Sequence, residues 1–253
     1  MNTTAFYTLF KKEVLRFWKV SLQTISAPII SALLYQLIFS HVMQGRGDVL
    51  PGVSYTSFLI PGLAMMSMLN NSFANTSSSL IQSRITGNLI FILLTPITYF
   101  EFFCAYVGAA ILRGLLVGLG VILVTFWFGL PMPTNLGWIL FFAFTACWVM
   151  GTFGLLAGIV AEKFDQLAMF QNFLIMPLTF LSGVFYSING LPPFWQKLSH
   201  FNPMFYMIDG FRYGFFGQSD VSPYLSASIV SISCIILTTT ILLLLKSGYK
   251  LRK

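Results

Sequence analysis

The sequence predicts an all-α polytopic membrane protein with six transmembrane helices, an N-terminal amphipathic interfacial helix, and re-entrant half-helices between spans five and six. Of its 253 residues, 57% are hydrophobic and only 8% are charged, whereas soluble domains carry roughly 25% charged residues. Several apolar runs reach about 20 residues, the length needed to cross a hydrocarbon core. The segment GLPPFWQKLSHFNP, which starts at Gly190, is too aromatic for a solvated loop and too interrupted by proline to span. We therefore expect a single transmembrane domain over residues 1–253.

Residues 1–20 are expected to form the interfacial helix, because residues 4–20 show helical periodicity. The apolar side of this helix carries Phe6, Leu9, Phe10, Val14, Phe17, Trp18 and Val20. The opposite side carries Lys11, Lys12, Arg16 and Lys19. Glu13 falls within the apolar side. Either a cation of the same chain neutralises it, or a partner protein contacts it.

Six apolar segments follow this helix, and each is long enough to cross the membrane. They cover about residues 25–43, 57–80, 103–130, 136–161, 167–188 and 224–245. Six crossings place both termini on one side. With that side inside, the inner loops and termini carry ten Lys and Arg residues against three outside. The positive-inside rule then makes both termini cytoplasmic in a multi-pass membrane protein.

The net charge of +7 is explained by this loop asymmetry, so we expect membrane lipids and no nucleic acid among the partners. The cysteines Cys104, Cys147 and Cys234 lie within apolar runs at no metal-like spacing, and two histidines are too few for a typical zinc site. We expect no disulfide framework, no metal site and no cleavable signal peptide.

A polar stripe runs through the second predicted span. Asn71, Asn75, Ser78 and Gln82 recur at helical spacing. Such groups do not face lipid. They serve either as contacts between helices or as the lining of a substrate pathway.

Two further features concern the third and fourth spans. The pairs Gly114 with Gly118, and Gly154 with Gly158, have the small-xxx-small spacing of closely packed helices. Arg113 lies inside the third span, where a charge is a functional hypothesis by default. The alternative is that it snorkels or pairs with Glu101 or Glu162.

The inner loop at residues 82–101 is apolar, yet it is broken at Gly87 and Pro96. A connector that is partly embedded in lipid and also touches a soluble partner would have this composition. The second inner loop, EKFDQ from Glu162, is charged and short. The candidate residues for contact with a partner are Glu13, Arg84, Gly87, Glu101, Glu162, Lys163 and Asp165.

The outer segment at residues 189–220 contains few charges. Pro192 and Pro193 can start a short helix because proline is tolerated in the first helical turn, and Pro203 then stops it. A second helix can follow, which gives a re-entrant pair. Asp209 and Arg212, three residues apart, can pair on it. The segment is either an interfacial anchor, with aromatic rings such as Trp195 and Tyr206 at the membrane surface, or a plug over an exit. The candidate pathway and exit residues are Asn71, Asn75, Ser78, Trp195, Tyr206, Asp209 and Arg212.

Motifs of catalysis are not found in the sequence. It contains no G-x-x-x-x-G-K-[ST] phosphate loop, no H-E-x-x-H helix and no G-x-S-x-G elbow. We therefore expect a non-enzymatic chain that has no catalytic residues and binds no cofactor of its own.

Two regions resemble a known family. They are SRITGNLIFILLTPITYFEFF, from Ser83, and SGVFYSINGLPPFWQKLSHFNPMFYMIDGFRYGFFG, from Ser182. Together with the length and the six spans, they resemble the ABC-2 permease family, which includes nodulation-factor and drug-export permeases. Family members often carry Glu immediately before the basic residue and the Thr-Gly pair, whereas this chain has Ser83 there.

The resemblance implies one transmembrane subunit of an ABC exporter. Two copies of the chain would form a homodimer driven by two copies of a separate ABC ATPase, which would bind ATP and Mg. The coupling helix seated on that ATPase would lie within residues 82–101.

Three function classes follow from these features. The first is an exporter subunit that moves an amphiphile (a lipid, glycolipid or drug) outward. The second is an ion-coupled secondary transporter of a hydrophobic substrate, for which the chain offers no carboxylate deep in a span and no internal repeat. The third is a non-transporting membrane scaffold or a membrane enzyme, and for the enzyme the sequence lacks a catalytic constellation.

Overall fold

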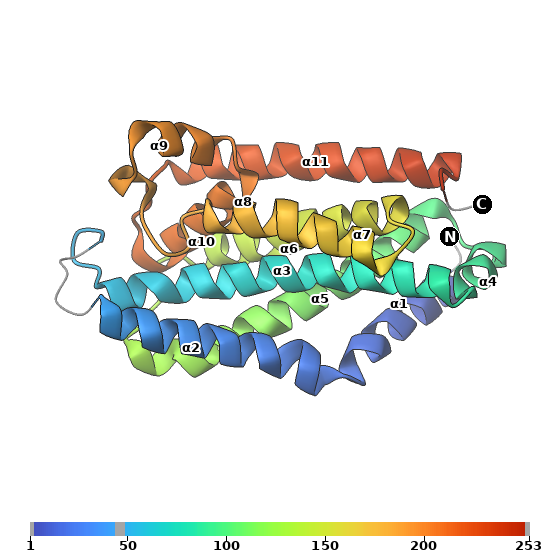
Figure 1. Cartoon of the computed structure of the whole chain (residues 1–253), viewed down its shortest axis with the longest axis horizontal. Coiled ribbons are helices and arrows are strands. Elements are labelled where there is room, and N and C mark those ends of the chain that lie inside the picture. The colour runs from blue at the N-terminus through green and yellow to red at the C-terminus, as the bar shows by residue number, and fades with distance from the viewer. Residues whose placement is uncertain (1–2, 44–48, 251–253) are drawn as a thin grey trace.

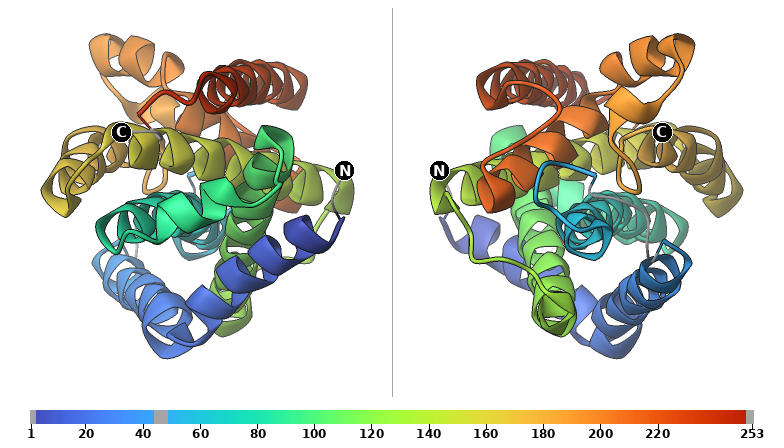
Figure 2. Two further views of the ribbon diagram at one scale, coloured as in Figure 1. Left: turned by 90° about the vertical axis from the view of Figure 1, so that its right-hand side faces the viewer. Right: turned by 90° about the vertical axis from the view of Figure 1, so that its left-hand side faces the viewer.

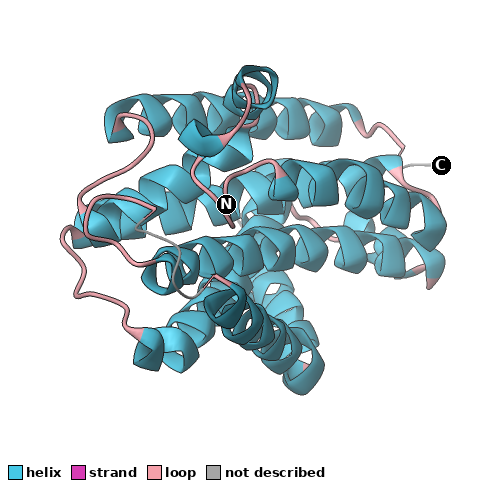
Figure 3. Cartoon of the chain, turned by 60° about the vertical axis from the view of Figure 1, so that its left-hand side comes forward, coloured by secondary structure: helices cyan, strands magenta, loops and turns pink. Residues whose placement is uncertain are grey.

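The computed structural model describes residues 3–43 and 49–250, and these residues form a bundle of helices without β-strands (Figures 1 and 3). The elements, in chain order, are α1 (Thr3–Trp18), η1 (Leu22–Ser26), α2 (Ala27–Val42), α3 (Tyr55–Ile85), α4 (Asn88–Leu94), α5 (Tyr99–Thr125), η2 (Phe126–Phe128), α6 (Leu136–Val160), α7 (Phe164–Met169), η3 (Phe170–Ile175), α8 (Met176–Phe180), η4 (Ile188–Gly190), α9 (Pro193–His200), α10 (Pro203–Phe216) and α11 (Pro223–Ser247). The expected all-helical fold class is confirmed.

Four of these helical stretches are long and apolar enough to cross a membrane within the described part of the chain. They are Leu22–Val42, Tyr99–Phe128, Leu136–Val160 and Pro223–Ser247. The predicted span at 57–80 lies in α3, which is 31 residues long but carries many polar residues. The predicted span at 167–188 is helical only to Phe180, after which the chain turns. Both segments run alongside the long helices in Figure 1, and the count of six crossings stays a prediction.

Helix α3 lies near the middle of the bundle, as the end-on views in Figure 2 show, and it packs mainly on α5 and α6. Both glycine pairs seen in the sequence lie at these contacts. A Cβ at Gly118 of α5 would stand 1.9 Å from Met68 Cε, and one at Gly154 of α6 would stand 2.3 Å from the Phe73 carbonyl oxygen. The expected role of these glycines in close helix packing is confirmed.

Helix α1 runs obliquely to α2 and packs against α5, and the π-helical turn η1 lies at the bend between α1 and α2 (Figure 1). Leu9 and Phe17 are buried on the side predicted to be apolar. Trp18 and Val20, assigned to the same side, are 57% and 47% exposed. The helix is present as predicted, but its apolar side is only partly covered by the chain itself.

The start of α1 and the end of α11 lie at one end of the molecule, where α4 also lies, and α9 lies at the opposite end (Figure 1). The described loops beside α9 include the start of α3 and the segment before α6, which are joined by a hydrogen bond from Ser57 Oγ to the Gly129 carbonyl (2.7 Å). The predicted six crossings would produce this arrangement.

The close approach of α6 to α3 yields a test. Replacing Gly154 with Ala places a methyl group against the Phe73 carbonyl, which costs about 1–3 kcal/mol in overpacking. We expect the thermal unfolding midpoint of the detergent-purified protein to fall by about 2–12 °C. The control is Gly190→Ala, because no atom lies within 4 Å of that Cβ position. Equal midpoints for Gly154→Ala and wild type would contradict the packing.

Candidate functional site

The connector between α3 and α5 takes the shape that its sequence predicts. Gly87 lies in the turn between α3 and α4 and directly precedes α4. Its φ of +75° is a left-handed conformation that favours glycine. Pro96 lies in the loop between α4 and α5. Leu89 of α4 is buried, whereas Phe91 and Leu94 are 70% and 76% exposed. The connector thus presents apolar side chains outward at the end of the molecule that carries both termini.

Glu101 is used inside the chain as a helix cap. Thr98 Oγ1 accepts a hydrogen bond from the Glu101 amide (3.2 Å), and Glu101 Oε2 accepts one from the Thr98 amide (2.8 Å). This capping box starts α5 four residues before the predicted span. Glu101 is 1% exposed, so a contact with a partner through it stays a prediction that the geometry does not favour.

Arg84 of α3 binds the end of α6 and the segment after α11, at the same end of the molecule as α4. Its guanidinium donates to the carbonyls of Ala161 and Ile159 beyond and within α6, and to the Lys250 carbonyl after α11. Lys250 Nζ in turn lies 3.2 Å from Glu162 Oε1. Burial lowers the pKa of Arg84, which lies beyond the predicted span, and the nearby Glu162 carboxylate opposes that shift.

The second inner loop lies beside the hydrogen bonds of Arg84 and the ion pair between Lys250 and Glu162. Glu162, Lys163 and Asp165 are all exposed, with Lys163 immediately before α7 and Asp165 in its first turn. A pocket of about 600 Å³ opens next to them, walled by apolar side chains of α7 and η3 such as Phe170 and Phe173. Charged and apolar surfaces therefore adjoin here.

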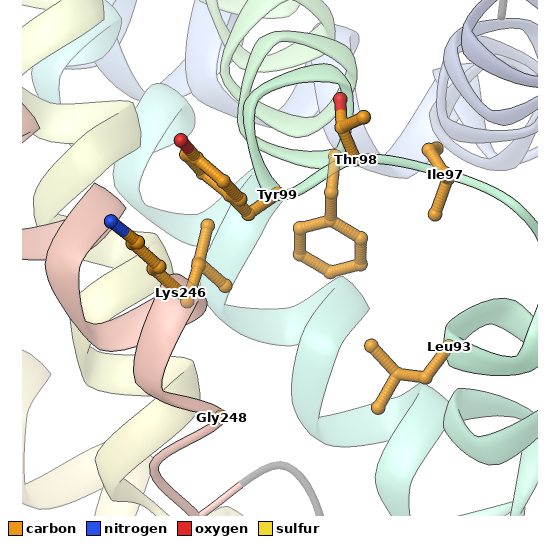
Figure 4. A pocket seen from close by; sticks show the side chains of 8 residues that line it. Leu93, Ile97, Thr98, Tyr99, Lys246 and Gly248 are labelled. Carbon is orange, nitrogen blue, oxygen red and sulfur yellow. The ribbon is translucent and has the colours of Figure 1, made fainter.

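Two hollows flank the connector. One, of about 290 Å³, lies between the connector, the start of α5 and the end of α11, and Figure 4 shows Lys246 and Tyr99 on one side of it and Leu93 on the other. The second, of about 420 Å³, lies between the connector and α1, where it is lined by Thr8, Lys12 and neighbouring residues. The connector is thus open on both flanks.

Glu13 of α1 is completely buried and paired within the chain. Lys12 Nζ lies 2.9 Å from Glu13 Oε1, and Arg16 Nε lies 3.3 Å from Oε2. Of the two alternatives for Glu13, the structure shows neutralisation by neighbouring cations. Arg16 also donates to Asn75 Oδ1 (2.9 Å), to the Asn75 carbonyl (2.7 Å) and to Ser78 Oγ (3.4 Å).

Asn71, another member of the polar stripe, meets a second arginine. Arg113 Nη2 donates to Asn71 Oδ1 at 2.9 Å, so the partner of Arg113 is an amide of α3 rather than the carboxylate of Glu101 or Glu162. The stripe residues Asn71, Asn75 and Ser78 are therefore contacts between helices in this structure, whereas Gln82, the fourth, is exposed near the end of α3. Their role in a substrate pathway stays a prediction.

The outer segment forms the two predicted helices, α9 and α10. Pro203 does more than end α9, because it occupies the first turn of α10 behind Asn202, whose side chain caps that helix (Oδ1 to the Met204 amide, 3.0 Å). Trp195 on α9 is 45% exposed. Tyr206, expected at the membrane surface, is instead buried, and its hydroxyl donates to the His200 carbonyl (2.8 Å), which ties α10 to α9.

Asp209 and Arg212 do not form the direct ion pair that their spacing allows, although they lie close enough to attract each other electrostatically. No salt bridge joins them among the described residues, because each side chain makes its hydrogen bonds to a different loop. Asp209 accepts hydrogen bonds from the amides of Asp220 (2.9 Å) and Val221 (3.2 Å). Arg212 donates to the carbonyl of Gly183 (3.0 Å), and its guanidinium carbon lies 3.7 Å from the centre of the Phe58 ring. Both side chains are buried structural supports of the outer loops.

Three residues with clear structural roles were not predicted. Arg16 could have been found, since it follows Glu13 by three residues on one helix face. Lys250 and Asp220 had no local signal. Asp220 accepts from the Ile188 amide (3.1 Å) and from Asn189 Nδ2 (3.1 Å), which are more than 30 residues away along the chain.

Long apolar helices, polar side chains that form hydrogen bonds between helices and a connector with exposed apolar side chains define a multi-pass helical membrane protein. Residues 4–216 match the ABC-2 type transporter family. The chain is 40% identical to the inner membrane transport permease YadH of Escherichia coli (strain K12) over 220 residues, which cover 86% of this chain and 85% of that protein. It is 25% identical to nodulation protein J of Rhizobium leguminosarum bv. viciae over 197 residues, 77% of this chain and 74% of the relative. The chain therefore belongs to the ABC-2 type transporter family, as its motifs indicated.

The role of Asp209 can be tested directly. Asp209→Asn replaces one acceptor oxygen with a donor that faces a backbone amide, and the loss of a hydrogen bond to a charged group is worth about 1.5–3 kcal/mol. We expect amide hydrogen exchange in the peptide covering residues 218–222 to accelerate by about 10- to 100-fold. Asp165→Asn, on the exposed surface of α7, should leave that peptide unchanged. Full protection of the peptide in Asp209→Asn would refute this support.

Proposed function

We propose that the chain is the transmembrane permease subunit of an ATP-binding-cassette exporter, which moves an amphiphile (a lipid, glycolipid or drug) outward across the inner membrane. Membership in the ABC-2 type transporter family supports this, as does the name of the Escherichia coli relative, an inner membrane transport permease. The sequence contains no phosphate loop of its own. ATP and Mg would bind to a separate ATPase, so this chain is a transport subunit rather than an enzyme.

The observation that carries the proposal is the exposed connector. Apolar side chains such as Phe91 and Leu94 point outward from α4, at the end of the molecule where Arg84, Lys163 and Lys250 gather. Hollows flank α4 on both sides. A soluble ATPase that covers α4, and reaches the charged loop at residues 162–165, would bury these side chains and receive or transmit movement through the connector.

A homodimer of the chain, with two copies of the ATPase, fits the polar surface of α3. Asn70 and Ser78 are only half-buried, and Gln171 Nε2 of η3 donates to Asn70 Oδ1 (3.2 Å) across this surface. Polar groups at this depth do not face lipid. A second copy placed against α3 and η3 would cover them and enclose a path between the two subunits.

The predicted orientation places α9 and α10 at the exit of an outward path. With both termini cytoplasmic, the connector faces the cytoplasm, and α9 and α10 lie at the outer end (Figure 1). The half-helices α9 and α10 would then form a re-entrant plug at the exit. The exposed Phe194 and Trp195 of α9 would meet the outer leaflet.

The proposed coupling can be measured after co-expression with an ABC ATPase encoded beside this chain. Gly87→Leu forces a side chain into a left-handed conformation, which costs about 1–2 kcal/mol and disfavours the connector turn by about 5- to 30-fold. We expect the complex to form, and the stimulation of ATP hydrolysis by this chain to fall by a similar factor. The matched control is Gly52→Leu, since Gly52 has φ +74° with no atom within 4 Å, but lies at the opposite end.

Two outcomes would overturn the proposal. Failure of the chain to co-purify with any ABC ATPase would rule out its role as a subunit of an ATP-driven exporter. Transport in proteoliposomes that needs an ion gradient and no ATP would instead support an ion-coupled secondary transporter. Normal stimulation by Gly87→Leu would move the coupling contact to the loop at residues 162–165.

The orientation has its own test. In a cysteine-free background, single cysteines at Ser54, Asn135 and Ser219 should react with an impermeant thiol reagent added outside intact cells. Cysteines at Thr3 and Ser247 should react only after permeabilisation, because an odd number of predicted crossings separates them from the other three positions. Labelling of all five positions from outside would reject the topology.

A further inference from the structure

Arg113 is a buried charge that the described part of the bundle compensates only in part. It lies near the midpoint of α5, a helix long and apolar enough to span a membrane. The residue is 7% exposed, and an arginine side chain does not lose its proton in proteins. A buried cation of this kind needs an anion or a complete set of acceptors.

The protein supplies only part of that set. Arg113 Nη2 donates to the neutral amide oxygen of Asn71. Arg113 Nε is buried and has no hydrogen-bond partner in the protein. One helical turn along the same side of α3, the amide nitrogen of Asn75 is also buried and without a partner, although Asn75 Oδ1 accepts from Arg16. Two unused donors therefore lie in one cluster.

The charges around these donors do not balance. Helix α1 contributes Lys12, Glu13 and Arg16, and α5 contributes Arg113. Arg16 is close enough to Arg113 for the two guanidinium groups to repel each other. Among the described residues, Glu13 is the carboxylate that pairs in this cluster, and both Lys12 and Arg16 already share it. Three cations face one anion.

We propose that this cluster, defined by Arg16, Asn71, Asn75 and Arg113, binds the anionic headgroup of an amphiphile through a phosphate or carboxylate. An oxyanion between Arg113 and Arg16 would accept from Arg113 Nε and from the Asn75 amide, and it would cancel the excess charge. Its acyl or isoprenoid part would extend out of the cluster into the surrounding lipid. The proposal rests on the proposed function, because it names the substrate class of the same permease.

Access to the cluster depends on α1. In this structure Arg16 closes the cluster, because it donates hydrogen bonds to Asn75 and Ser78. Helix α1, which carries Arg16, packs across α5 (Figure 2). The anion replaces these bonds of Arg16 when α1 moves away from α3. Because α1 also lines the hollow next to the connector, binding in the cluster and movement of the connector would be linked through one helix.

The test uses the full chain purified in detergent without any ATPase. Short-chain phosphatidylglycerol, short-chain phosphatidylcholine and inorganic phosphate are titrated separately, and binding is followed by native mass spectrometry and by the thermal unfolding midpoint. We expect wild type to bind the anionic lipid about 10- to 100-fold more tightly than the zwitterionic one, as for hydrogen bonds to a charged group. The preference should vanish in Arg113→Gln and persist in Arg113→Lys. The matched control is Lys197→Gln, an exposed cation of α9 outside the cluster.

Each outcome decides the proposal. Equal affinity of wild type for both lipids, or an unchanged preference in Arg113→Gln, would overturn it. If Arg113→Gln does not fold, Asn75→Leu replaces it, and retention of the full preference by Asn75→Leu would also count against the cluster. Binding of inorganic phosphate with the same dependence on Arg113 would support the anion site and assign it to free phosphate, whereas lipid binding alone assigns it to a headgroup. Because no ATPase is present, failure of ATP-driven export would leave this result unaffected.

Discussion

The satisfaction of polar groups away from water is the constraint on which the bundle depends, and α3 is where it acts most strongly. Ser72 Oγ donates to the Ala110 carbonyl of α5 (3.2 Å), and Thr76 Oγ1 donates to the Gly151 carbonyl of α6 (2.7 Å). Such bonds from a side chain to the backbone of a neighbouring helix require close contact between helices. Glycines on α5 and α6 permit that contact. Polar α3 and its glycine-bearing neighbours therefore form one interdependent unit.

Charged side chains follow the same rule at the two ends of the bundle, where they bind backbone groups more than each other. At the end with the termini, Arg84 holds carbonyls of three residues from two segments. At the other end, Asp209 and Asp220 hold backbone amides, and Arg212 holds carbonyls. Each end thus keeps its loops in place without a large soluble domain. The exposed surfaces of α4 and α9 lie just outside these supports.

The sequence predicted the features that depend on local chemistry. Helix periodicity, proline positions and apolar length located α1, α9, α10 and the long helices, and the glycine spacing located the contacts of α3. The missed features depend on partners distant in the chain. Asp209 and Arg212 have the spacing of an ion pair, but the loops at 183–184 and 220–221 offer each of them a better-placed backbone partner. Arg113 similarly meets Asn71, 42 residues away, and no local pattern encodes that choice.

The hydrogen bonds of Arg84 join residues that are synthesised at very different times. Arg84 is translated early, but one of its acceptors is the carbonyl of Lys250, which follows the last described helix. The ribosome adds that acceptor only after the residues of α1 to α11 have been joined. The surface around α4 therefore reaches the form seen here only after residue 250 has been added, and a chain that stops before Lys250 would leave Arg84 without this carbonyl.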